Sequence, residues 1–246
     1  MTFLETLQID SGVVRTAVSR LATDGWLDRD KVGRNSFYKL AASGRERFES
    51  GVAHVYNPQS PDWAGRLELV LISNGADRDA SRAALNEAGF GNPMPGVWVA
   101  PSGVALPSVA AGAIRLEVSA DNEMGRRLIG ESWPLPRIAD SYRVFLKLFA
   151  PLDNWVAGSD TLPPADAMLV RVLLIDQYRR VLLRDPLLPP ELLPADWPAA
   201  EARALCGRIY RALLPEAEQW LDLHGQSAAG KLPPAGKELA RRFAER

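Results

Sequence analysis

A basic segment near the start of the chain constrains the fold more than any other feature. Residues 11–48 read SGVVRTAVSRLATDGWLDRDKVGRNSFYKLAASGRERF and contain no proline. Ser11 can cap a helix that runs from Gly12 to about Asp24, with Gly25 as its stop. A short helix over residues 2–7, across a tight turn, completes helix-turn-helix spacing. Apolar residues at helical spacing predict one buried face on the longer helix, formed by Val14, Ala17, Val18 and Leu21.

A small basic hairpin follows this helix. We expect one strand to begin at Trp26, a return strand over residues 36–40, and a loop over residues 28–35 around Gly33. Residues 13–48 hold eight Lys and Arg against four Asp and Glu, whereas the whole chain holds 29 against 30. Because the chain as a whole is not basic, contact with double-stranded DNA has to come from this local surface. The polar helix face and the hairpin predict DNA contacts by Arg15, Thr16, Ser19, Arg20, Arg29, Lys31, Arg34 and Asn35.

The middle of the chain has the pattern of a small α+β domain. Runs of apolar and β-branched residues predict strands over 66–73, 96–101 and 113–119. Helical spacing predicts one helix over 77–88 and a second, shorter helix over 121–129. This order of elements is typical of a ferredoxin-like βαββαβ domain.

The C-terminal part is predicted to be mostly helical, over residues 137–149, 165–184 and 199–222. The segment 185–198, DPLLPPELLPADWP, is too rich in proline for a helix and apolar enough to pack as an ordered loop. We expect the tail after Gly225 to be loosely held. The α+β chain thus divides into a helix-turn-helix and hairpin domain over 1–50, a linker over 51–62, a ferredoxin-like domain over 63–131 and a helical domain over 132–246.

Composition excludes several functional classes. The chain has one cysteine, Cys206, and two distant histidines, His54 and His224, so we expect no disulfide framework and no metal site. We find neither an apolar run of about 20 residues nor a signal peptide, so we expect a cytoplasmic protein without a membrane partner. The phosphate-binding glycine motifs and the G-x-S-x-G nucleophile motif are also missing, and we expect no cofactor and no enzymatic activity.

Several segments together resemble the PaaX-type transcriptional repressors, the regulators of phenylacetic acid degradation. The resemblance covers nearly the whole chain in colinear order, which makes it more specific than any single motif. It is carried by VRTAVSRLATDGWLDRDKVGRNSFYKL (14–40), HVYNPQSPDWAGRLELVLI (54–72), GFGNPMPGVWVAP (89–101), SYRVF (141–145) and YRRVLLRDPLLPPELLPADWP (178–198).

The resemblance implies a winged helix-turn-helix, a central domain similar to the CRISPR-associated Cas2 proteins, and a helical C-terminal domain. It also implies a homodimer that binds an operator and represses a catabolic operon until an acyl-CoA effector, typically phenylacetyl-CoA, releases it. An acyl-CoA site needs cations for the phosphates and apolar walls for the acyl group. We assign these roles to Arg179, Arg180, Trp155 and Trp197.

The chain departs from the family pattern at its start. Family members carry a further helix before the position of Thr2, so the first helix of the winged-helix fold is expected to be absent here. Phe3, Leu4 and Leu7, together with Val18, would then lack part of their packing partner. Either the start is truncated, or the helix at 42–50 or a partner subunit covers the gap.

Two other functions compete with a DNA-binding regulator. A Cas2-like domain raises a metal-dependent nuclease, but the first strand ends in Asn74 with no carboxylate before Asp77, and an amide is a poor ligand for a hard cation. A DNA-independent dimerisation module is the second alternative, because the strands over 66–73 and 96–101 are apolar enough to form a subunit interface.

Overall fold

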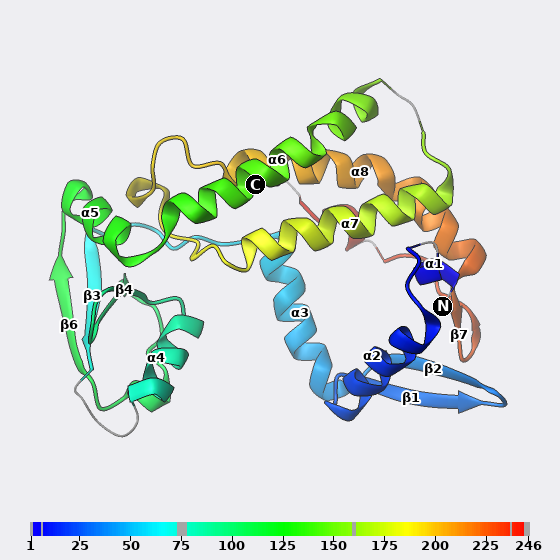
Figure 1. The fold of residues 1–246 in the computed structure, drawn as a ribbon, viewed down its shortest axis with the longest axis horizontal. Coiled ribbons are helices and arrows are strands. Elements are labelled where there is room, and N and C mark those ends of the chain that lie inside the picture. Colours follow the sequence, from blue (N-terminus) through cyan, green and yellow to red (C-terminus); the bar gives the residue numbers. More distant parts are fainter. Residues whose placement is uncertain (1, 6, 73–77, 159–160, 237, 244–246) are drawn as a thin grey trace. The chain divides into compact units, whose positions relative to one another are not determined.

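The computed structural model describes residues 2–5, 7–72, 78–158, 161–236 and 238–243. It is an α+β protein with small antiparallel sheets and long helices (Figure 1). The chain forms two compact units, each built from separate stretches of sequence. Unit 1 comprises Met1–Asn57, Phe149–Tyr178 and Arg203–Arg246, and unit 2 comprises Pro58–Leu148 and Arg179–Ala202.

Unit 1 begins with the predicted pair of helices, but the details of the longer helix differ from the prediction. Its N-terminal cap is Asp10, not Ser11, because the Asp10 carboxylate accepts hydrogen bonds from the backbone N–H of Gly12 at 2.7 Å and of Val13 at 3.3 Å. The predicted buried face is wrong: no residue of α2, all of which the structure describes, is buried. The helices are α1 (Thr2–Glu5) and α2 (Ser11–Thr23).

The hairpin after α2 is longer in strand and shorter in loop than predicted. Strands β1 (Leu27–Val32) and β2 (Asn35–Leu40) pair antiparallel along their whole length, from Leu27 opposite Leu40 to Val32 opposite Asn35. The loop is only Gly33 and Arg34, and Gly33 has φ +61°. Glycine at the first loop position is what a two-residue hairpin of type II′ requires. Helix α3 (Ala42–Tyr56) follows, so residues 51–56 of the predicted linker are helical.

Unit 2 contains a four-stranded antiparallel sheet with the order β4-β5-β3-β6. Sequence reasoning missed β4, whereas the helix predicted over 121–129 is present as α5, directly after β6. The βαββαβ order itself is not reproduced, because only a single turn, η1, stands between β5 and β6, where Gly103, Pro107 and Gly112 disfavour a helix. The elements are β3 (Arg66–Leu71), α4 (Arg78–Glu87), β4 (Gly91–Met94), β5 (Val97–Pro101), η1 (Ser108–Ala110), β6 (Ile114–Ser119) and α5 (Asn122–Ser132).

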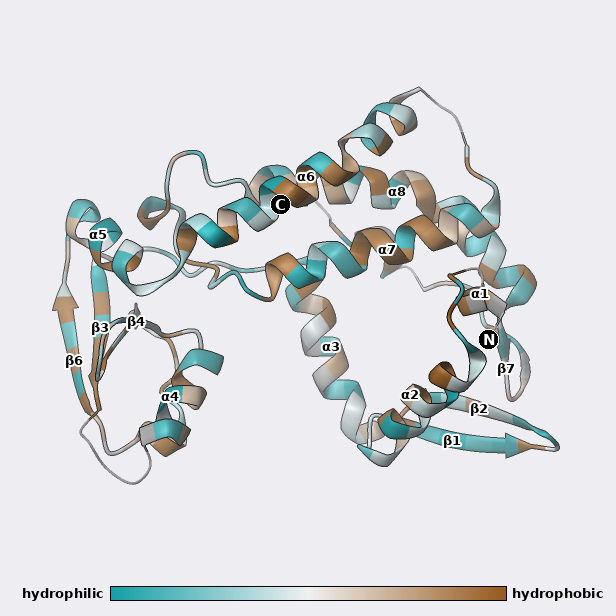
Figure 2. Cartoon of the chain, in the orientation of Figure 1, coloured by the Kyte–Doolittle hydropathy of each residue, from teal (hydrophilic) through white to brown (hydrophobic). Residues whose placement is uncertain are grey.

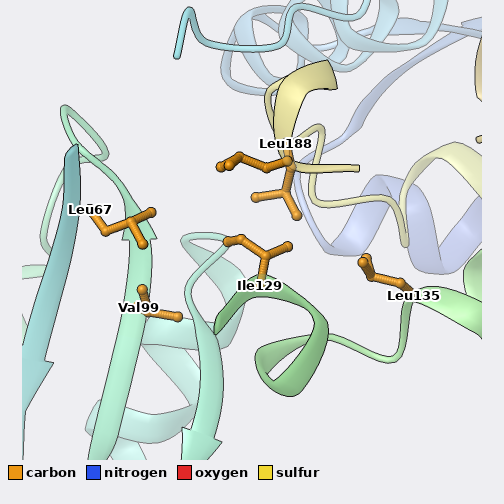
Figure 3. Packing of buried hydrophobic residues seen from close by; sticks show 6 residues of the cluster. Leu67, Val99, Ile129, Leu135 and Leu188 are labelled. Atoms are coloured by element: carbon orange, nitrogen blue, oxygen red, sulfur yellow. The ribbon is translucent and has the colours of Figure 1, made fainter. Parts of the chain in front are cut away.

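Alternation along β3 directs side chains into two cores, one on each face of the sheet. Leu67 and Val99 project from the strands toward Ile129 and Leu188 (Figure 3). The opposite face carries the second core, in which α4 takes part through Leu85. The first core is Leu67, Val99, Ile129, Leu135, Leu188 and Leu192, and the second is Val70, Leu85, Phe90, Trp98, Ala100 and Ala110.

The three long helices match the predicted helical segments, and apolar and polar residues alternate around them (Figure 2). Each of them has residues in both units. Among the described residues, no helix is both long and apolar enough to cross a membrane. They are α6 (Leu135–Ala157), α7 (Pro164–Leu182) and α8 (Ala199–His224), with the single turn η2 (Pro190–Leu192) between α7 and α8.

The tail after α8 forms the short hairpin of β7 (Gln226–Ser227) and β8 (Gly230–Lys231) and the turn η3 (Leu239–Arg241). The prediction of a loosely held tail is wrong at Phe243, which is 1% exposed. Its ring lies 5.2 to 5.7 Å from the rings of three tyrosines that come from α3, α7 and α8. We name this the Phe243 cluster, and its members are Phe243, Tyr56, Tyr178 and Tyr210.

Candidate nucleic-acid interface

The eight residues predicted to contact DNA are all exposed in the structure. Four come from α2 and four from the hairpin, two of the latter from β1, one from the loop and one from β2. On α2 the four are spaced as two i,i+4 pairs and form one polar strip, opposite the half-buried Val14 and Val18. The eight are Arg15, Thr16, Ser19, Arg20, Arg29, Lys31, Arg34 and Asn35.

A hollow of about 760 Å³ brings half of this set together. Arg15 from α2 lines it with Arg29, Arg34 and Asn35 from the hairpin. The other four predicted residues do not appear among the described side chains that line it. Further lining comes from Val14, Val18, Ser36, Phe37, Tyr38 and Gln226. Sequence reasoning had no reason to include Gln226, which is 186 or more positions away from the hairpin residues and is brought close only by the fold of unit 1.

The hairpin separates its charges by strand alternation. Paired residues share a face, so Arg29 and Lys31 lie with Tyr38 and Ser36 on one face, whereas Asp28 and Asp30 point to the other. The Asp30 carboxylate lies 3.2 Å from the Lys39 ammonium, on that other face. The acidic residues of the hairpin therefore do not cancel the basic face.

Local hydrogen bonds fix two of the candidate side chains. The Arg29 guanidinium donates to the Ser36 hydroxyl from Nε at 3.0 Å and from Nη2 at 2.7 Å. The Thr16 hydroxyl donates to the Gly12 carbonyl at 2.9 Å, so its proton is used within the helix and its oxygen serves as an acceptor. Both side chains are thus oriented before any ligand arrives.

The start of the chain finds a packing partner within unit 1. Phe3, Leu4 and Leu7 are half-buried. The Phe3 ring meets the Trp220 ring of α8 edge to face, with centroids 5.4 Å apart. Helix α8 thus contacts part of the surface for which the sequence left truncation, the helix at 42–50 or a partner subunit as alternatives.

The four predicted effector residues are divided between the two units. Arg179 and Arg180 are exposed in the last turn of α7, Trp155 lies on α6 within unit 1, and Trp197 is half-buried in unit 2. Trp197 lines two hollows of about 330 and 350 Å³. The described lining of neither includes Arg179 or Arg180.

The cation beside Trp197 is Arg143, which sequence reasoning did not select. It lines the second hollow and contacts the carboxylates of Asp140 at 3.0 Å and Asp196 at 2.9 Å. Its signal in the sequence is the segment SYRVF, one of those that carry the family resemblance.

A buried carboxylate holds the proline-rich loop in unit 2. Asp185 is 7% exposed and accepts hydrogen bonds from the Tyr142 hydroxyl and from the backbone N–H of Leu187, both at 2.8 Å. Leu187 has φ +50°, a left-handed conformation that its side chain disfavours. Asp185 therefore stabilises an otherwise costly turn of this loop.

The residues of the nuclease alternative, Asn74 and Asp77, lie outside the described residues. Within the described parts of the chain, no group of three His, Cys, Asp or Glu side chains could hold a metal ion. The buried carboxylate of the sheet, Glu68, forms an ion pair with Arg115.

A basic helix followed by a basic hairpin is a feature of transcriptional regulators. The chain belongs to one family of them, the PaaX-like proteins. Residues 1–44 match the family model described as PaaX-like protein, and residues 133–223 match that of the PaaX-like protein C-terminal domain. This family is one of transcriptional repressors and the chain is not an enzyme, so the nuclease alternative is not favoured.

Two comparisons with individual proteins agree with the family. The chain is 34% identical over 257 residues to the transcriptional repressor PaaX of Escherichia coli (strain K12), covering 98% of this chain and 81% of the relative. Among solved structures it is similar to the uncharacterized protein Rv0674 from Mycobacterium tuberculosis. That similarity has a TM-score of 0.60 and 26% identity, and it covers 87% of this chain and 88% of the other.

Proposed function

We propose that this regulator of phenylacetic acid catabolism is a repressor that binds a double-stranded operator through α2 and the β1–β2 hairpin. The observation that carries the proposal is the hollow that joins Arg15 of α2 to Arg29, Arg34 and Asn35 of the hairpin. A duplex lying against this surface meets cations from two separate elements at once.

In this proposal, residues 1–50 act as a winged helix-turn-helix. The polar strip of α2 enters the major groove, where Arg15 and Arg20 read guanine and the Thr16 oxygen accepts from exocyclic amines. Ser19 contributes a second hydroxyl there. The hairpin is the wing and lies along the phosphates, with Arg29, Lys31, Arg34 and Asn35 as contacts.

The rest of the chain comprises a ferredoxin-like domain, a linker and a helical domain in this proposal. We assign residues 63–131 to a ferredoxin-like domain, because the sheet order β4-β5-β3-β6 has the first strand between the third and the fourth, as that fold does. Residues 57–62 are the linker, because residues 51–56 belong to α3, and residues 132–246 are the helical domain. The protein acts in the cytoplasm as a homodimer, as a repressor that reads a two-fold operator requires.

Fluorescence anisotropy with a labelled promoter fragment tests the DNA interface. The logarithm of the binding constant is expected to fall linearly with that of salt concentration, and Arg34→Ala to reduce the slope by about 1. Arg15→Ala is expected to weaken binding by about 1–3 kcal/mol and to relax base preference at one position. Arg127→Ala, an exposed arginine on α5, is the matched control. No salt-dependent binding, or an equal loss in the control, would overturn the proposal.

The effector in this proposal is an acyl-CoA, with phenylacetyl-CoA as the first to be tried. Arg179, Arg180, Trp155 and Trp197 are carried forward as candidate contacts, to be replaced one at a time. A ligand that binds only the folded state stabilises it and so raises the melting midpoint. The stabilisation is about 2.7 kcal/mol when the ligand concentration is a hundred times the dissociation constant. A midpoint unchanged by aryl and aliphatic acyl-CoAs alike would exclude this class of effector.

A further inference from the structure

The two edges of the sheet in unit 2 are built differently. At one edge, β4 is short, contains Pro93, and shifts register between Gly91 and Met94. A proline and an irregular register are devices that prevent an edge from pairing with another strand.

The other edge, β6, has none of these devices among its described residues. It runs for six residues without proline, in regular register with β3, and lies at the outer side of the sheet (Figure 1). Ile114 and Leu116, on one face of this strand, are 61% and 45% exposed. A regular strand edge with exposed apolar side chains is a template for one more strand.

The sequence of β6 specifies which strand fits. Residues 114–118 read Ile-Arg-Leu-Glu-Val, so the three apolar residues lie on one face of the strand. The two residues of opposite charge, Arg115 and Glu117, lie on the other face, one on each side of Leu116. We propose that β6 pairs antiparallel with the β6 of a second copy of this chain, about a two-fold axis at Leu116. This pairing sets Leu116 opposite the partner's Leu116 and Ile114 opposite the partner's Val118 on one face. Arg115 faces the partner's Glu117 on the other.

Charge selects this register against its neighbours. Only every second residue of a strand directs its backbone N–H and C=O toward a given edge. The next registers that keep the hydrogen bonds therefore have the two-fold axis at Arg115 or at Glu117 in place of Leu116. Either move places like charges directly opposite each other, which destabilises the pair. The axis at Leu116 also extends ion pairs already present, from Glu68 through Arg115 to the partner's Glu117 and the partner's Arg66.

The inference gives the homodimer of the proposed function its interface and therefore rests on that part of the proposal. The mass of the full chain in solution, by light scattering after gel filtration, is expected to be twice 26.9 kDa. Leu116→Lys puts two ammonium groups together on the axis and should raise the dimer dissociation constant at least about tenfold. Val144→Lys, at an apolar position of α6 that is 67% exposed, is the matched control and should stay dimeric.

Cysteine substitution reads the register directly and does not depend on how Leu116→Lys folds. Directly opposed Cβ atoms of paired strands lie about 4.5–5.5 Å apart, within reach of a disulfide, so Leu116→Cys should form a covalent dimer on oxidation. The two copies of Ile114→Cys lie four residues apart along the paired strands, about 13 Å, and should not cross-link. Cys206, the only native cysteine, is buried and gives no background.

A monomeric wild type, a dimer untouched by Leu116→Lys, or cross-linking at Ile114→Cys in preference to Leu116→Cys would overturn the inference. Failure of the DNA proposal looks different, because in that case the chain remains dimeric and cross-links at Leu116→Cys but has no salt-dependent affinity for the promoter. The Arg34→Ala variant is expected to bind the promoter fragment more weakly and to keep the mass of a dimer.

Discussion

Replacing Phe243 by alanine is expected to destabilise unit 1 severely, although the residue lies near the end of the chain. Its side chain is 1% exposed and packs edge to face on Tyr56 and Tyr178 and at a tilt on Tyr210. Gly207 on α8 leaves it room, because a Cβ there would come within 3.0 Å of the Phe243 Cβ. The surroundings are therefore shaped around this ring.

The magnitude follows from this burial. Truncation of a buried phenylalanine costs about 3–5 kcal/mol in lost transfer free energy and cavity formation. The left-handed φ of +59° at Phe243 is not relieved by the change, since alanine is strained there too. For a chain of this size the loss corresponds to a fall in melting temperature of roughly 6–20 °C.

Thermal and urea unfolding, followed by circular dichroism, measure this loss. Phe48→Ala is the matched control, because the Phe48 side chain on α3 is 47% exposed and its truncation should cost less than about 1 kcal/mol. Equal losses in the two variants, or a loss below 1 kcal/mol for Phe243→Ala, would refute the view that this ring anchors the tail.

Three further results are expected. Tyr142→Phe removes a buried hydrogen bond to Asp185 and should lower the free energy of unfolding by about 1–3 kcal/mol in urea titrations, whereas an unchanged value would place the hydroxyl outside the stabilising contacts. Burial raises the pKa of the Cys206 thiol, so a thiol reagent at pH 8 should label one cysteine per chain only after denaturation; labelling of the native protein would contradict this. Burial also raises the pKa of Tyr56 above its ordinary value of 10.0, against the opposing effect of the Arg242 cation. The folded state therefore holds this proton more tightly than the unfolded state. The contribution of the Tyr56 hydroxyl to the free energy of unfolding is full below pH 10 and is lost as the pH rises above 10. Tyr56→Phe should flatten that alkaline decline in stability, and a decline of the same slope would assign it to other groups.

Strong periodicity made much of the fold predictable. The long helices carry apolar residues at helical spacing, and β3 and β5 are buried apolar runs, so their existence followed from local pattern. Strand β4 did not, because Gly91-Asn92-Pro93-Met94 has low strand propensity and is held in place by pairing with β5. The tail escaped prediction for a similar reason, since Phe243 and Arg242 anchor it through contacts distant in sequence.

The candidate site was predictable in its residues and less so in its geometry. Arg15 and Arg34 belong to a cationic cluster visible in the sequence, and the structure gives them one hollow. The strand character of residues 28–32 was hidden, because both faces of the hairpin contact water and no apolar alternation marks them. Arg143 and Gln226 were missed because only the folded chain brings them to a hollow.

The two-residue turn at Gly33 and Arg34 limits the conformational freedom of the hairpin tip. A flexible loop of the length first expected would have to be ordered on DNA at a cost of about 1–2 kcal/mol per residue. A tip held by a paired ladder leaves mainly the Arg34 side chain to be immobilised, at about 0.5–1.5 kcal/mol. In the proposed complex with an operator, the charge at the tip is therefore already ordered when it meets a phosphate, and lengthening the turn with glycines should weaken operator affinity without removing a single cation.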